Sequence, residues 1–181
     1  MKILYETDRL IIRQWLQKDK YDLYEYASDP NVTKYLSFPT YTSMQDAVDR
    51  INKLRKQYKQ SRIDTDYCIQ LKNNTKVIGS IGLHNYTTTN DGEIEIGYVL
   101  NSKYQGNGYM TEALKGMIEY IHKNHIAKRI SANHNVENVR SGNVMKRAGM
   151  TKEGVLRRAG KSNHYSRFDV AVYSILDEEI K

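Results

Sequence analysis

A glycine-punctuated loop in the middle of the chain has the composition of an anion-binding site. It runs from Gln105 to Thr111 with the sequence QGNGYMT, and its two glycines place no Cβ atom between the backbone and a ligand. The amides of residues 108 to 111 are expected to be the unpaired first-turn donors of a helix that follows. Together with the positive end of the helix dipole, these donors suit a pyrophosphate group.

The segments on both sides of this loop have the patterns of a strand and a helix. From Glu93 to Leu100, apolar side chains occupy every second position, which predicts a strand. After the loop, apolar residues recur with the spacing of one helix face, at Met110, Ala113, Leu114, Met117, Ile118 and Ile121. The loop lacks the G-x-x-x-x-G-K-[ST] sequence of a P-loop, and a Rossmann fingerprint would need glycine or alanine where Thr111 stands. For the glycines alone, a plain turn from strand to helix is the alternative.

At these residues the chain resembles the GCN5-related N-acetyltransferase (GNAT) superfamily, whose acetyl-CoA signature is [QR]-x-x-G-x-[GA]. Gln105 to Met110 match this signature, except that Met110 replaces the small final residue. Three more segments are similar to the branch of ribosomal-protein N-terminal acetyltransferases, and they occur in the same order along the chain. They are TDRLIIRQW near the start, NVENVRSGNVMKRAGMTKEG after the central helix, and FDVAVYSILDEE near the end.

The resemblance implies an α/β (α+β) fold with a mixed, mostly antiparallel central sheet and helices on both faces. The fourth and fifth strands of such a sheet splay apart, and the pantetheine arm of acetyl-CoA enters the gap between them. Acetyl-CoA is therefore the expected co-substrate, and no metal is expected. The residues expected to contact it are Tyr98, Val99, Leu100, Gln105, Gly106, Asn107, Gly108, Tyr109, Met110, Thr111, Asn138 and Ser141.

Acetyl transfer requires a polarised thioester carbonyl and a stabilised leaving thiolate. A main-chain amide between Tyr98 and Leu100 could polarise the carbonyl if the strand bulges at Gly97, although a glycine there could simply make room for a neighbouring side chain. In the resemblance, Asn138 contacts the pantetheine arm and Ser141 lies near the sulfur, where it could protonate the thiolate. Both could instead be ordinary helix caps. Many superfamily members use a tyrosine for the thiolate, and the alternatives here are Tyr104, Tyr109 and Tyr165.

The acceptor amine must also lose a proton. A peptide α-amine has a pKa of about 8 and lysine one of about 10.4, so an α-amine needs only a modest base, which could act through water. Glu95 is the candidate base because it lies on the strand just before the proposed bulge. Glu93 on the same face and His84 at the end of the preceding strand are held in reserve. Glu95 could equally be a surface or salt-bridged carboxylate.

Length and composition indicate one domain that covers residues 1–181, with its core at about 8–178. The single cysteine, Cys68, excludes an internal disulfide, and no run of 18 apolar residues or signal-peptide core is present, so we expect a cytoplasmic protein without membrane contact. Lys and Arg number 28 against 21 Asp and Glu, a net charge of +7 that could steer the protein to a ribosome. His122 and His125 have no ligand partner nearby in sequence, so they do not predict a metal site.

The remaining segments predict alternating helices and strands. The expected elements are a strand at Leu10 to Ile12, helices at Lys18 to Tyr26 and Asn31 to Leu36, a helix from Thr42 or Ser43 to Gln60, a hairpin of Tyr67 to Leu71 and Lys76 to His84, a strand from Gly92, a strand at Arg129 to His134, a helix at Val139 to Ala148, and strands at Thr151 to Arg158 and Tyr165 to Leu176.

The sequence thus predicts an acetyl-CoA-dependent N-acetyltransferase that transfers the acetyl group directly to a primary amine. The resemblance to the ribosomal-protein branch favours the α-amine of a protein N-terminus. One alternative is a small-molecule amine, such as a polyamine, an amino acid or an antibiotic. Two others are a non-catalytic acyl-CoA-binding module and a basic protein that binds RNA. The sequence leaves the oligomeric state open, a homodimer included.

Overall fold

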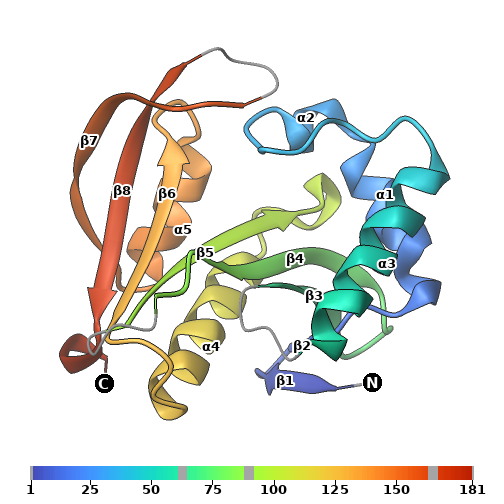
Figure 1. The fold of residues 1–181 in the computed structure, drawn as a ribbon, viewed down its shortest axis with the longest axis horizontal. Coiled ribbons are helices and arrows are strands. Elements are labelled where there is room, and N and C mark those ends of the chain that lie inside the picture. The colour runs from blue at the N-terminus through green and yellow to red at the C-terminus, as the bar shows by residue number, and fades with distance from the viewer. Residues whose placement is uncertain (1, 61–64, 88–91, 163–166, 181) are drawn as a thin grey trace.

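The sheet at the centre of the molecule contains eight strands in the order β1-β2-β3-β4-β5-β6-β8-β7 (Figure 1). The computed structural model describes residues 2–60, 65–87, 92–162 and 167–180, and all structural statements concern this part of the chain. The strands are β1 Ile3–Glu6, β2 Leu10–Arg13, β3 Thr65–Leu71, β4 Val77–His84, β5 Glu93–Leu100, β6 Arg129–Asn135, β7 Thr151–Gly160 and β8 Phe168–Leu176.

Neighbouring strands are antiparallel except for β5 and β6, which are parallel and diverge. These two strands pair only from Glu93 to Glu95, opposite Arg129 to Ser131. Beyond that point β5 continues along β4, and β6 continues along β8, as Figure 1 shows. The predicted splay is confirmed, and the strands concerned are β5 and β6 because β1 adds a strand at the N-terminus. β1 was not predicted, since four residues are too few to give a clear periodic pattern.

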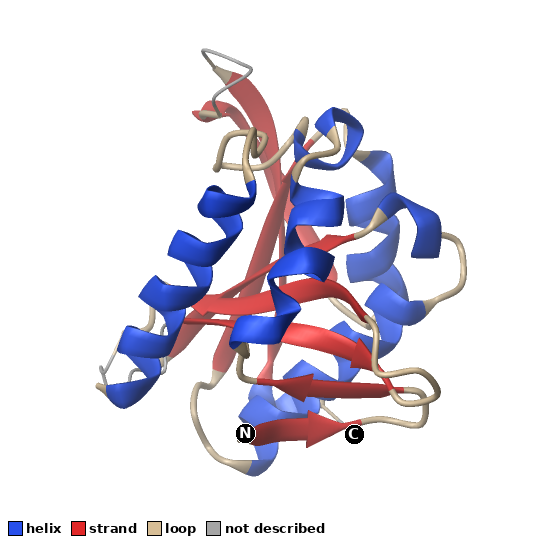
Figure 2. Cartoon of the chain, turned by 90° about the vertical axis from the view of Figure 1, so that its right-hand side faces the viewer, coloured by secondary structure: helices blue, strands red, loops and turns tan. Residues whose placement is uncertain are grey.

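Helices cover both faces of this sheet (Figure 2). α1 Lys20–Ala27 and α3 Met44–Lys59 pack on one face, and α4 Tyr109–Lys123 and α5 Val139–Arg147 pack on the other. Shorter elements are α2 Pro30–Thr33 and the 3₁₀ turns η1 Gln17–Asp19, η2 Ser102–Tyr104 and η3 Asp177–Glu179. The predicted helix at Lys18 begins as η1, and residues 163–166 of the predicted last loop and strand lie outside the described residues.

Two hydrophobic cores lie on the two faces of the sheet. The predicted apolar face of α4, from Met110 to Ile121, is buried against β2 to β6, which confirms the helical periodicity. On the other face, Leu23 and Tyr26 of α1 and Ile51 and Leu54 of α3 form the second core. Among the described residues, no helix combines the length and the apolar character that crossing a bilayer requires.

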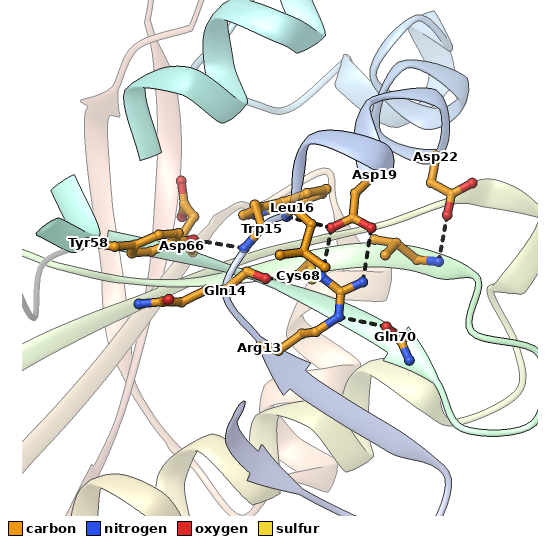
Figure 3. Close-up of polar contacts among 11 residues, drawn as sticks. Arg13, Gln14, Trp15, Leu16, Asp19, Asp22, Tyr58, Asp66, Cys68 and Gln70 are labelled. Atoms are coloured by element: carbon orange, nitrogen blue, oxygen red, sulfur yellow. Dashed lines mark hydrogen bonds and ion pairs between the residues drawn. The ribbon is translucent and has the colours of Figure 1, made fainter. Parts of the chain in front are cut away.

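A buried ion pair fixes the start of α1 to β2 (Figure 3). Arg13 has no exposed side-chain surface, and its Nη1 and Nη2 lie 2.7 Å and 3.0 Å from the two carboxylate oxygens of Asp19. Its Nε donates to Gln70 Oε1 at 2.6 Å, and Asp19 also accepts from the amide of Leu16 at 2.8 Å. Both charges therefore keep hydrogen bonds although neither meets water, which is the condition for burying them.

Glu25 of α1 forms ion pairs with Lys76, just before β4, and with Lys103 of η2, and these pairs predict how stability depends on pH. Hydrogen bonds from Lys76 and Lys103 lower the pKa of Glu25 to about 2. An unfolded glutamate has a pKa of about 4.3, so this group stabilises the fold above that pH and ceases to do so as the pH falls toward 2. We expect Glu25→Gln to lose about 1 kcal/mol of stability at pH 7 and nothing relative to wild type near pH 2. Urea unfolding across this range measures it.

The control for this prediction is Glu178→Gln, which changes an exposed carboxylate at the C-terminal end. It should leave the unfolding free energy within a few tenths of 1 kcal/mol of wild type at every pH. A loss for Glu25→Gln that stays constant from pH 7 to 2 would contradict the assignment, because it would then not arise from ionisation.

Candidate active site

The loop before α4 adopts a backbone conformation that only glycine accepts readily. Gly106 has φ +83° and Gly108 has φ +77°, and Gly108 is the N-cap of α4. Side chains with a Cβ are strained in this left-handed region. A Cβ at Gly106 would have no atom within 4 Å, so the glycine there leaves open space above the backbone. From the sequence we expected these glycines to let a ligand approach the backbone closely, and their backbone conformation and the open space at Gly106 are consistent with this role.

The amides of this loop point to no acceptor within the described part of the chain. From residue 106 to residue 111, none donates a hydrogen bond to a described residue. The first amide to bond is that of Glu112, which donates to the Gly108 carbonyl at 3.0 Å. A row of unpartnered amides at the start of a 15-residue helix fits a diphosphate group.

Arg9 holds the loop in place from the turn between β1 and β2. Its Nη1 donates to the carbonyl of Asn107 at 3.1 Å, and its Nε lies 2.6 Å from Glu112 Oε2. Its guanidinium also lies 4.4 Å from the centre of the Tyr109 ring. The sequence did not predict this role, because Arg9 is nearly 100 residues away from the loop. The contacts fix the loop before any ligand binds, which reduces the entropy that binding costs.

Gln105, the first residue of the signature, joins the loop to two other elements. Its Nε2 donates to the carbonyl of Leu100 at 3.2 Å, and its Oε1 accepts from Arg140 Nη1 at 2.8 Å. The glutamine therefore connects the end of β5 to the first turn of α5. The structure thus brings the loop, β5 and α5 together.

The edge of β5 that faces β6 is free of sheet partners beyond Glu95. The Gly92 carbonyl accepts from β6-side amides, whereas the Asn101 amide donates to the Ile78 carbonyl on the β4 side. Because backbone groups alternate along a strand, the amides of Tyr98 and Leu100 face the gap. The amide of Val99 faces β4, so the expected cofactor contact of Val99 does not come from its amide.

The expected bulge at Gly97 is wrong. β5 stays in register with β4 from Glu95 to Leu100, without any shift. Gly97 instead makes room for a neighbouring side chain, since a Cβ there would lie 3.3 Å from the His84 ring. No bulge is needed to present the Tyr98 and Leu100 amides, because β6 has already diverged from this edge.

The hydroxyl groups of Tyr98 on β5 and Ser141 on α5 are within hydrogen-bond distance. The Tyr98 hydroxyl lies 3.0 Å from both the main-chain oxygen and Oγ of Ser141. Burial raises the pKa of Tyr98, so its hydroxyl keeps its proton at neutral pH. Asn138 caps α5 by accepting from the Ser141 amide at 3.4 Å. The sequence predicted Ser141 here but not the hydroxyl of Tyr98.

The tyrosines that the sequence suggested for the thiolate lie elsewhere. Tyr104 is in η2, and Tyr109 lies under the guanidinium of Arg9. Tyr165 falls outside the described residues. Tyr98 could have been recognised because its side chain lies on the face of β5 opposite to Glu95 and Gly97, a few residues before the signature loop.

A cavity of about 180 Å³ lies on the opposite face of the sheet, between β5 and the helices α1 and α3. Its apolar wall is mainly aromatic, and it is completed by the segment between α2 and α3. The lining residues are Trp15, Leu23, Tyr26, Leu36, Ser37, Phe38, Tyr41, Arg50, Leu54, Asp66, Ser80, His84, Gly97, Tyr98 and Val99. This cavity could not be predicted from the sequence, because its walls come from seven separate segments.

The three candidate bases occupy different environments. Glu95 accepts from Asn85 Nδ2 at 2.9 Å and from Asn133 Nδ2 at 2.7 Å, and it is not part of the cavity lining. Glu93 lies 3.1 Å from Arg129 Nε. His84 does line the cavity. Among the candidates, only this imidazole therefore borders the cavity.

The surroundings of Cys68 and His122 indicate structural roles for these two side chains. Cys68 is fully buried, and burial raises the pKa of its thiol, which agrees with a packing role. His122 Nδ1 lies 2.5 Å from Asp177 Oδ1 at the end of α4. Within the described ranges, no group of three or more His, Cys, Asp or Glu side chains is arranged to hold a metal ion.

Comparison with known proteins agrees with this geometry. A family model described as an acetyltransferase (GNAT) domain matches residues 9–151. The chain is 35% identical over 174 residues to an uncharacterised N-acetyltransferase, YnaD, of Bacillus subtilis, with 96% of each protein covered. It is 28% identical over 165 residues to the [ribosomal protein uS5]-alanine N-acetyltransferase of Escherichia coli, with 84% of this chain and 80% of that protein covered.

A solved structure extends the comparison to the cofactor. The microcin C7 self-immunity acetyltransferase MccE, in complex with acetyl-CoA and AMP, superposes with a TM-score of 0.83 at 25% identity, covering 94% of this chain and 93% of that one. The family match covers more than half of the chain, and the splayed sheet, the signature loop and the α5 cap agree with it. The chain belongs to the GNAT superfamily of N-acetyltransferases, in the branch that includes the ribosomal-protein N-terminal acetyltransferases.

Proposed function

We propose that this protein transfers the acetyl group of acetyl-CoA directly to a primary amine, and that the acceptor is the α-amine of a protein N-terminus. The observation that carries the proposal is the position of Gly97 and Tyr98. These residues border the cavity on one face of the sheet, the Tyr98 amide faces the gap between β5 and β6, and the Tyr98 hydroxyl meets Ser141 of α5 on the opposite face. Two reactants that approach from the two sides would meet at this segment of β5, as direct transfer requires.

The chain supplies the groups that this reaction needs. Bound coenzyme A would bring the acetyl group as an activated thioester. The amides of residues 106 to 111 would hold its diphosphate, and the edge amides of Tyr98 and Leu100 would donate to the thioester oxygen. The hydroxyls of Tyr98 and Ser141, which share a hydrogen bond, would protonate the departing thiolate. The one cysteine is buried, which argues against an acyl-enzyme.

Three points support a protein N-terminus as the acceptor. An α-amine is far easier to deprotonate at neutral pH than a lysine side chain. A relative that covers most of the chain is named as a [ribosomal protein uS5]-alanine N-acetyltransferase. Finally, α3 borders the cavity and presents exposed Lys53, Arg55, Lys56 and Lys59, a basic surface suited to a large acidic partner.

A small-molecule amine is the second candidate. The cavity of about 180 Å³ could enclose a small molecule, and the similar MccE structure contains AMP as well as acetyl-CoA. Both acceptors use the same transfer chemistry. They differ only in what extends beyond the cavity.

An acceptor panel tests the proposal. Lysine-free octapeptides that begin with Ala, Ser, Gly or Met are compared with spermidine and with free amino acids, by thiol release and by mass spectrometry of the products. We expect the peptides to give at least tenfold higher kcat/KM, with the acetyl group on the α-amine. The matched control is the same peptide with a blocked α-amine, which should release no thiol. Turnover of spermidine or amino acids alone would favour the small-molecule acceptor, and tight acetyl-CoA binding without any thiol release would refute catalysis.

A further inference from the structure

Two glycines lie side by side in the sheet next to the cavity, and they create space for a pair of titratable side chains. Gly82 of β4 and Gly97 of β5 are directly paired in the sheet. A Cβ at Gly82 would clash with the carboxylate of Asp66 and lie 2.6 Å from His84 Nε2. A Cβ at Gly97 would lie 3.3 Å from the same ring. The imidazole and the carboxylate thus occupy the space above two positions of the sheet that carry no side chain.

His84 and Asp66 belong, together with Arg50, to a chain of three polar side chains in the cavity wall. His84 Nε2 lies 3.4 Å from Asp66 Oδ1, and Asp66 Oδ2 forms an ion pair with Arg50 of α3. Asp66 is only 16% exposed, whereas His84 is 39% exposed. The carboxylate is therefore held from two sides, and the imidazole is the member that borders the open cavity.

We infer that His84 is the catalytic base that deprotonates the acceptor amine, with Asp66 and Arg50 as the residues that position it. The inference rests on the proposed transfer to an amine, and it holds for either kind of acceptor. Glu95 is less suited to this task because amide groups of Asn85 and Asn133 occupy both of its oxygens at the closed end of the gap. A carboxylate partner that fixes a histidine base is a recurrent catalytic arrangement.

The proton balance of the step is complete. The acceptor ammonium, R–NH3+, gives one proton to the His84 imidazole, and the neutral R–NH2 forms a C–N bond to the acetyl carbon. The C–S bond then breaks, and the second N–H proton reaches the departing sulfur through the hydroxyls of Tyr98 and Ser141. The imidazolium releases its proton to water. The sum is an ammonium and a thioester converted to an amide, a thiol and one proton.

Several charged or titratable groups act on this imidazole. Asp66 of β3 is its direct partner, Arg50 of α3 lies behind that carboxylate, and Glu95 occupies the paired position on β5. The cavity wall also contains the hydroxyls of Tyr26 and Tyr41. The pH dependence of the reaction therefore needs to be compared among variants of His84 and of the two neighbouring carboxylates, Asp66 and Glu95, not read from wild type alone.

The test measures kcat/KM from pH 6 to 9 for His84→Gln, Asp66→Asn and Glu95→Gln, with the best acceptor of the panel described above. We expect His84→Gln to lower kcat/KM at pH 7 by about 10²-fold or more, with acetyl-CoA affinity by calorimetry within twofold of wild type. Without a base only the neutral amine reacts, so the ratio of wild type to His84→Gln should shrink at least tenfold as the pH rises to 9. Asp66→Asn should lower kcat/KM but keep the shape of the wild-type pH profile, without the steeper rise with pH expected of His84→Gln.

The matched control is His122→Gln, which removes another histidine with an aspartate partner, far along the chain at the end of α4. It should match wild type in kcat/KM at every pH. A His84→Gln profile parallel to that of wild type, or the pH-dependent loss in Glu95→Gln instead, would overturn the inference and leave the proposed function intact. Absence of thiol release by wild type with every acceptor would overturn both.

Discussion

Replacing Gly108 with tryptophan is expected to abolish acetyl-CoA binding, with at least a 100-fold loss of affinity by calorimetry. The glycine has φ +77°, and an added Cβ would lie 3.6 Å from the guanidinium of Arg9. An indole at this position would cover the amides that begin α4 and push against the clamp that orders the loop. The strain of a side chain at this φ is about 1 to 2 kcal/mol, which the fold should tolerate.

The control is Gly154→Trp, because Gly154 lies in the exposed strand β7, where an added Cβ meets nothing within 4 Å. This variant adds the same bulk away from the loop and should bind acetyl-CoA like wild type. Thermal unfolding of both variants separates a misfolded protein from one with a blocked site. If Gly108→Trp retained wild-type affinity while folded, the diphosphate would have to bind elsewhere.

The largest effect on stability is expected from Asp19→Ala, a loss of about 3–5 kcal/mol in the free energy of unfolding. The substitution leaves the guanidinium of Arg13 without its carboxylate, and Arg13 has no exposed surface through which water could replace it. It also removes the acceptor of the Leu16 amide at the start of η1. Urea unfolding monitored by circular dichroism measures the loss.

A matched control for Asp19→Ala is Glu6→Gln, which breaks the exposed pair of Glu6 with Lys72, where the side chains are 48% and 36% exposed. That loss should stay below about 1 kcal/mol. The double variant Arg13→Met/Asp19→Leu should recover much of the lost stability, because apolar side chains of similar size remove both buried charges. An Asp19→Ala loss as small as that of Glu6→Gln would show that water reaches Arg13.

Features that depend on neighbouring residues could be predicted from the sequence. The buried face of α4 and the glycines of the loop follow from spacings of one to four residues, and both are present. Asn138 and Ser141 could likewise be placed together because they are one helical turn apart. In each of these cases the geometry is set by the helix or the turn itself.

Features that are assembled from distant segments could not be predicted from the sequence. Arg50, Asp66 and His84 come from α3, β3 and β4, and their contact depends on two glycines that face each other only once the sheet has formed. Arg9 reaches the loop across about 100 residues for the same reason. The prediction of a bulge was wrong because it was inferred from Gly97 alone. The divergence of β6 already leaves the β6-facing edge of β5 unpaired.

The short pairing of β5 with β6 lies between two halves of the chain that contribute different parts of the site. Among the described residues, those that line the cavity all precede residue 100, whereas Ser141 belongs to the half that begins with β6. Tyr98 is the member of the first half whose hydroxyl touches that serine. In the proposed mechanism, acceptor preference would therefore drift through changes in the N-terminal half alone, while Ser141 of the C-terminal half would continue to protonate the departing thiolate.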